Sequence, residues 1–172
     1  MEKPQEAQEL GNKITMLTVT YQTELLGSRQ VFNHAHILFP LNEVATWKAA
    51  GIKRVNGTIN GAPFRLALQS DGEGGLYLMI GKDLCKKAKL EIGQQVQVYI
   101  EQDLDPDRID FAEEFLEVLS QDPEASEKFF AFTIGKQRSL NIYITQVKSV
   151  ESRLKRSFEL ANKIKRNALS GG

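Results

Sequence analysis

The 172-residue chain is 41% hydrophobic and 26% charged, and its 22 basic residues balance its 22 acidic residues. This composition excludes collagen-like, low-complexity and wholly disordered chains. No apolar run approaches the roughly 18 residues that a membrane-spanning helix needs. The polar first residues do not resemble a signal peptide, and Cys85 is the only cysteine, so an intrachain disulfide is excluded. We therefore expect a cytoplasmic protein without a membrane span.

The neutral total conceals an uneven distribution of charge along the chain. Residues 1–100 carry 11 Lys and Arg against 9 Asp and Glu. Residues 101–127 carry 1 against 11, and residues 128–172 carry 10 against 2. An acidic segment is thus followed by a basic tail. We expect the acidic segment to favour the start of the next helix. The sequence does not decide whether this segment also docks against the basic tail.

The first hundred residues alternate between short strand patterns and turns. β-branched and aromatic residues from Ile14 predict one strand, and residues 31–39 predict a second, so the two suggest a hairpin. A short helix is predicted from Leu41, with Gly51 as its stop. Thr15, Leu17, Val19, Tyr21 and Thr23 are expected on one face of the first strand.

Asn60-Gly61 is a strong hairpin turn between two further strands, because both residues tolerate positive φ. Residues 76–80 predict another strand, residues 81–90 a short helix, and residues 95–103 a final strand. Six or seven short strands without long crossover helices predict a small closed β-barrel. Its core should include Val55, Ile59, Leu66, Leu68, Leu78, Val96, Val98 and Ile100.

After Asp103 the apolar period becomes helical, which predicts three or four helices and an α+β fold class overall. Asp122 before Pro123, Thr133 and Ser149 are predicted N-caps. We expect a β-barrel domain over residues 13–103, a helical segment over 111–168, and flexible ends at 1–12 and 169–172. Phe115, Leu119, Phe129, Tyr143, Ile144, Leu154 and Phe158 should be packed.

Several of these stretches resemble known families. VNGTINGAPFRLAL and KDLCKKAKLEIGQQVQVYIEQD resemble a bacterial domain of unknown function with a double-split β-barrel, distantly like AbrB-type barrels. The part from EEFLEVLSQDPEASEKFF to YITQVKSVESRLKR resembles the bacteriocin-protection, YdeI or OmpD-associated segment. Together they cover roughly residues 14–168. The resemblance implies no established reaction. The family's name implies a link to resistance against bacteriocins and other envelope-active peptides, and a possible link to an outer-membrane porin. Cys85 stands where the family usually has Arg.

Arg54, Asn60 and Arg65 are the candidate ligand-binding residues. They could form a cationic, amide-lined pocket for an anionic or polar ligand, such as a small polar molecule or a peptide, with Arg as a bidentate donor. The structural alternative is that Asn60 is present because the turn requires its backbone conformation, and that Arg65 is a surface charge that aids solubility. Our first functional hypothesis is a non-catalytic binding module of this kind, linked to envelope or antimicrobial-peptide stress.

A second hypothesis is nucleic-acid binding by the last helix, in which Arg153, Arg156 and Lys163 would contact phosphates. AbrB-like barrels include DNA binders, which favours this interpretation by analogy alone. The alternative is a solvated helix face, because the chain is neutral and no aromatic–basic stacking motif is present.

The third hypothesis is an enzyme of unknown reaction using Cys85. Its thiol lies among Lys82, Lys86, Lys87 and Lys89 near a predicted helix start, a setting that could lower its pKa and make it reactive. No base partner is visible, so we expect a passive side chain and no catalysis. His34 and His36 share a strand face but provide only two ligands at metal-binding spacing, where zinc needs three or four. We therefore expect neither a metal nor a cofactor.

Overall fold

The computed structural model describes residues 15–27 and 34–169. The chain divides into two compact units, Met1–Pro106 and Asp107–Gly172. Each unit has its own buried cluster of apolar side chains, so each is described by itself.

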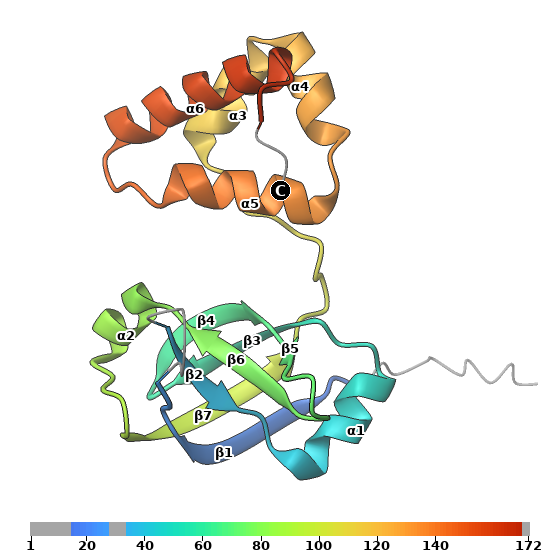
Figure 1. Ribbon diagram of the computed structural model, residues 1–172, viewed down its shortest axis with the longest axis vertical. Helices are drawn as coiled ribbons and strands as arrows, with labels where there is room; N and C mark the ends of the chain where they lie inside the picture. The colour runs from blue at the N-terminus through green and yellow to red at the C-terminus, as the bar shows by residue number, and fades with distance from the viewer. Residues whose placement is uncertain (1–14, 28–33, 170–172) are drawn as a thin grey trace, which may run out of the picture. The chain divides into compact units, whose positions relative to one another are not determined.

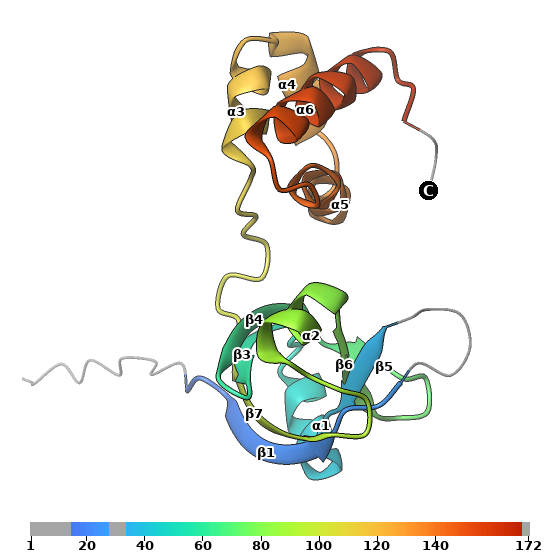
Figure 2. The ribbon, with the colours of Figure 1, turned by 90° about the vertical axis from the view of Figure 1, so that its left-hand side faces the viewer.

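In its described residues, the N-terminal unit contains two antiparallel sheets and two short helices (Figures 1 and 2). One sheet has the strand order β1-β7-β3-β4, and the other has the order β2-β6-β5. The elements run in the order β1 (Thr18–Glu24), β2 (Ala35–Leu38), α1 (Leu41–Ala49), β3 (Arg54–Ile59), β4 (Ala62–Ala67), β5 (Gln69–Ser70), β6 (Leu76–Ile80), α2 (Lys82–Ala88) and β7 (Gln95–Gln102).

Over the described residues, the expected hairpin between the first two strands is not the main pairing of either strand. β1 pairs along its whole length with β7, and β2 pairs with β6. Over the described residues, a single bridge between Leu26 and His36 joins the end of β1 to β2. The strand predicted from residue 31 is described only from Ala35, and residues 31–33 lie outside the described part.

The expected closed barrel is also not observed: in the described part of the unit, the strands form two open sheets. Alternation of apolar and polar residues along a strand identifies its inner face but not its neighbouring strands. The pattern could therefore not distinguish a closed barrel from two open sheets. The α+β class and the turn at Asn60-Gly61 are confirmed, since β3 and β4 pair on either side of that turn.

Side chains from both sheets pack into one core, with Trp47 of α1 fully buried in it. The Trp47 ring meets Phe39 edge-on, with centroids 5.0 Å apart. The predicted core residues are buried here except Leu66, which is partly buried and packs against the cluster. Alternating inward positions, as in Val96, Val98 and Ile100 of β7, explain why this core could be predicted.

Up to residue 169, where the described part ends, the C-terminal unit is a group of four helices, α3 (Glu113–Ser120), α4 (Pro123–Phe130), α5 (Ile134–Thr145) and α6 (Val150–Lys165). The three predicted N-caps are confirmed. Asp122, Thr133 and Ser149 each accept a hydrogen bond from a backbone N–H three residues later. None of the described helices of the chain is both long and apolar enough to cross a membrane.

Phe115, Leu119, Phe129 and Ile144 are buried in this unit, as predicted. Two predictions are wrong: Phe158 is 55% exposed and Tyr143 is 37% exposed. On α6 the core-facing position is taken by Ser157, whose hydroxyl donates to the Arg153 carbonyl at 2.7 Å. A polar side chain can face a core when its hydrogen bond is made within the helix, and Phe158 is then turned about 100° away.

Gly57 lies where β3 is enclosed by its two neighbours. A Cβ at this position would lie 2.2 Å from the Tyr99 carbonyl and 2.7 Å from the Phe64 ring. We expect Gly57→Ala to lower the free energy of unfolding by about 3 kcal/mol, because backbone must shift to make room.

Gly81→Ser is the matched control. A Cβ at Gly81 would meet no heavy atom within 4 Å, and this residue precedes α2, where Ser is a good N-cap. Urea denaturation of both variants measures the difference, and equal stabilities would contradict the account.

Candidate functional site

The structure does not gather Arg54, Asn60 and Arg65 into one pocket. Arg54 begins β3, whereas Asn60 follows the end of that strand. Six strand residues span about 20 Å, so these two lie at opposite ends of the hairpin. Arg65 on β4 pairs with Asn56 and lies toward the Arg54 end. Only Arg54 and Arg65 are therefore neighbours. The Asp103 carboxylate forms an ion pair with Arg65 and also interacts electrostatically with Arg54.

Arg65 is held by the segment that follows β7. Its Nε donates to Asp103 Oδ2 at 2.7 Å, and its Nη2 donates to the Asp105 carbonyl at 2.8 Å. Burial of Asp103 raises the pKa of its carboxyl, but the Asp105 N–H and the charges of Arg65 and Arg54 outweigh this effect. The pKa of Asp103 is therefore below its usual value. This ion pair fixes the end of the sheet to the chain that leaves it.

Asn60 has the geometry of a turn residue. It adopts a positive φ of 46°, and the following Gly61 has a φ of 81°. Its N–H donates to the Gln97 carbonyl at 2.9 Å, and its side-chain oxygen accepts from the Gln97 N–H at 2.8 Å. The side chain thus extends the β3–β7 ladder by one rung beyond the strand end.

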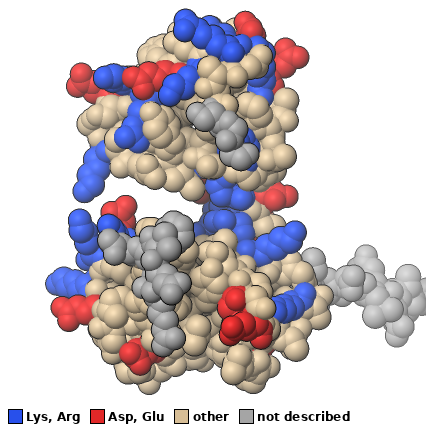
Figure 3. All heavy atoms as spheres, viewed as in Figure 1, with Lys and Arg blue, Asp and Glu red and all other residues tan. Residues whose placement is uncertain are grey.

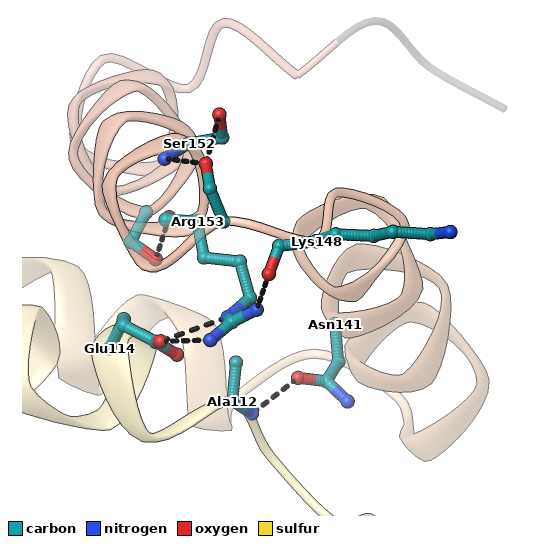
Figure 4. Close-up of polar contacts among 8 residues, drawn as sticks. Ala112, Glu114, Asn141, Lys148, Ser152 and Arg153 are labelled. Carbon is teal, nitrogen blue, oxygen red and sulfur yellow. Dashed lines mark hydrogen bonds and ion pairs between the residues drawn. The ribbon is translucent and has the colours of Figure 1, made fainter.

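Arg153 and Arg156, two of the three residues considered for nucleic-acid binding, already bind other groups of the helical unit. Figure 4 shows Arg153 between Glu114 and the Lys148 carbonyl, with the closest Arg153–Glu114 contact at 2.7 Å. The Arg156 guanidinium lies 4.6 Å from the centre of the Tyr143 ring and donates to the Tyr143 carbonyl. Lys163 is exposed on α6.

Two carboxylates of the acidic segment pair with cations of the basic tail within this unit. Glu114 binds Arg153, and Asp122 binds Lys165 at 2.6 Å. In the visible face of Figure 3, basic and acidic side chains of this unit are interspersed. The basic charge of α6 is therefore partly neutralised where it lies.

Cys85 lies in the middle of α2, not at its start, and is half-buried. Burial raises the pKa of its thiol, which is opposite to the lowered pKa that the surrounding lysines suggested. A small cavity of about 290 Å³ reaches this thiol. Its other lining residues are Leu25, Ala35, Ile80, Lys82, Lys86, Leu90 and Ile92.

His34 and His36 do not form part of a metal site in the described residues, where no group of three His, Cys, Asp or Glu side chains could hold a metal. His36 meets the Tyr77 ring edge-on, with centroids 6.1 Å apart. His36 also lines a larger cavity, at the end of β1.

This cavity of about 620 Å³ opens where β1 ends and β2 runs past it. Its described lining contains two carboxylates, one imidazole and three aliphatic side chains, and Leu38 and Ile92 there are 47% and 61% exposed. The described lining contains no Lys or Arg. Its residues are Glu24, Leu26, Gly27, His36, Leu38, Glu73 and Ile92.

Sequence reasoning missed this cavity because its residues come from four separate segments. Two signals could have indicated it. Leu38 is the outward-facing apolar residue of a short strand, and Ile92 is an exposed apolar residue in a turn before Gly93. Single exposed apolar residues are common, so only their meeting in space is informative.

Two protein-family models match the chain. Residues 21–100 match a domain of unknown function, DUF1905, and residues 108–167 match the family described as bacteriocin-protection, YdeI or OmpD-associated. Neither a curated protein nor a solved structure gives a significant match.

The Arg65–Asp103 pair predicts a pH-dependent stability. A carboxyl with a lowered folded-state pKa stabilises the fold above its usual pKa of 3.8, and this contribution is lost as the pH falls through the lower, folded value. We expect Asp103→Asn to cost roughly 2 kcal/mol at neutral pH, since Asp103 is only 8% exposed and charge-paired. Urea titrations over pH should show the gap to the native protein closing in acid. Asp105→Asn, an exposed neighbour, is the control, and a gap that does not change with pH would contradict the assignment.

Proposed function

We propose that this chain, a DUF1905 domain followed by a bacteriocin-protection, YdeI or OmpD-associated domain, is a non-catalytic binding module. The observation that carries the proposal is the 620 Å³ cavity at the meeting of β1 and β2. Its volume falls in the range of small-ligand sites, and its mixture of apolar walls and a few charged groups is typical of them.

The lining favours a ligand that is both cationic and partly apolar. Glu24 and Glu73 supply negative charge, and Leu26, Leu38 and Ile92 supply apolar contact. A peptide containing basic and aliphatic residues combines these properties. This site differs from the one predicted from the sequence, where Arg54, Asn60 and Arg65 would have favoured an anionic ligand.

A peptide ligand is consistent with the name of the C-terminal family, which refers to bacteriocin protection. We accordingly propose that the binding function belongs to resistance against envelope-active or antimicrobial peptides, and that it is exercised in the cytoplasm. The lack of a described membrane-spanning helix is compatible with this placement.

The two alternative functions have less support from the geometry. Arg153 and Arg156, two of the three residues proposed to contact phosphates, already bind groups of their own unit. The pKa of the Cys85 thiol is raised, which disfavours the nucleophile that an enzyme would need.

Removing apolar contact from the cavity should weaken peptide binding. We choose the peptide acetyl-Lys-Val-Lys-Val-Lys-Val-amide, labelled with a fluorophore, as the probe. The double variant Leu38→Ser and Ile92→Ser should raise its Kd about tenfold, because two partly exposed side chains lose part of their apolar contact. Fluorescence anisotropy measures the change.

The matched control is Leu41→Ser, which makes the same substitution at an 81% exposed residue outside the cavity lining. We expect its Kd to stay within about twofold of the native value. Glu24→Gln with Glu73→Gln should also weaken binding and reduce its dependence on salt. Absence of binding by the native protein, or equal loss in the control, would refute the proposed function.

A further inference from the structure

β1 has one paired edge and one open edge. It stands at the end of the sheet order β1-β7-β3-β4, so among the described strands β7 alone lies beside it in the ladder. The Leu25 N–H donates to the Gln94 carbonyl, and the Leu17 carbonyl accepts from the Gln102 N–H. These bonds fix the odd-numbered residues as the ones that bond to β7.

The even-numbered residues of β1 therefore direct their N–H and C=O groups toward the open edge. The first even residue beyond the strand demonstrates this, because Leu26 exchanges two backbone hydrogen bonds with His36 of β2 at 2.9 and 2.8 Å. Before that bridge, no described strand pairs with the outer side of β1. Thr18, Thr20, Gln22 and Glu24 are all exposed. A row of backbone groups without a strand partner thus leads to the cavity.

The opposite end strand of the same sheet is protected, and β1 is not. In β4 the residue opposite Thr58 is Pro63, which has no N–H to offer, and Arg65 is occupied by Asp103. Proline and charge are the usual means by which proteins prevent pairing at a sheet edge. The sequence of β1, TVTYQTE, contains no proline or lysine and is rich in strand-forming residues.

The charge around this edge specifies what would pair with it. β1 and β7 together contain two carboxylates, Glu24 and Glu101, and no Lys or Arg. Glu73 adds a third carboxylate in the cavity at the end of the edge. A second copy of β1 would bring no cation to these groups, so the charge favours a basic partner.

We propose that an extended basic peptide adds to the outer edge of β1 as a further strand and places an apolar side chain in the adjoining cavity. This inference deepens the proposed function and rests on it. Main-chain hydrogen bonds to the even-numbered residues supply affinity, and the cavity and carboxylates supply selectivity. In such a strand, alternate side chains lie beside Glu24 on the outer face, and the others lie toward the partly buried Val19 and Tyr21. An alternating basic and aliphatic peptide fits this pattern.

Proline substitution at an outward-facing N–H tests strand addition directly. Gln22→Pro removes a backbone donor that β7 does not use, so the sheet should remain intact while the incoming strand is blocked. We expect the Kd for the Lys-Val peptide to rise at least about tenfold, against less than about twofold for Gln22→Ala. Circular dichroism and melting temperature confirm that both variants fold.

A modified probe keeps the test valid should Gln22→Pro fail to fold. Two versions of the same peptide carry N-methyl groups on alternate backbone nitrogens, one version on each set of residues, and keep its charge and side chains. In the version whose methyl groups face β1, the backbone cannot donate hydrogen bonds to that edge. At least one of the two methylated peptides should bind the native protein about tenfold more weakly than the parent. A Glu-Val peptide of equal length should bind more weakly still.

The outcomes separate this inference from the proposed function. One outcome is that Leu38→Ser with Ile92→Ser abolishes binding, whereas Gln22→Pro and both methylated peptides leave the Kd unchanged. That outcome would support the cavity as the binding site and overturn strand addition. No binding by the native protein would overturn both. A native dimer in light scattering that Gln22→Pro dissociates would assign the edge to a second copy and overturn the peptide proposal.

Discussion

The pairing of β1 with β7 is the contact on which the rest of the N-terminal domain depends. It joins segments far apart in the sequence and matches Val19 and Tyr21 to Ile100 and Val98 across the ladder. Because β1 uses its odd-numbered backbone groups for this pairing, its even-numbered groups must face away. The pairing also separates β1 from β2, since one bridge joins their described residues and the cavity opens beside it. The open edge and the cavity are thus two consequences of one strand arrangement.

The conspicuous charges of the sequence mostly stabilise structure. Arg65 closes the end of a sheet through Asp103, and Arg153 fixes α6 to α3 through Glu114. Arg153 also satisfies the Lys148 carbonyl, one of the acceptors exposed between helices. A charged side chain that already has buried or half-buried partners is a poor candidate for ligand recognition, because the ligand would have to replace them.

Much of the local structure could be predicted from the sequence. The caps Asp122, Thr133 and Ser149 and the turn at Asn60-Gly61 depend on local chemistry, and alternation revealed the inner face of β7. The partner of β1 could not be predicted, because its inner face looks the same whichever strand lies beside it. Phe158 was misplaced for a related reason: the helical stripe fits either Ser157 or Phe158, and only packing selects Ser157. The cavity lay beyond reach because it needs Leu38, Glu73 and Ile92 to meet.

Hydrogen exchange at the individual amides of β1 tests the central claim most directly. In the free protein, the amides of Thr20, Gln22 and Glu24 should exchange quickly, whereas those of Tyr21 and Thr23, bonded to β7, should exchange slowly. Saturating Lys-Val peptide should protect the first group and leave the second unchanged. Even-numbered amides that are already protected without peptide, or that remain unprotected when it is bound, would contradict strand addition at this edge.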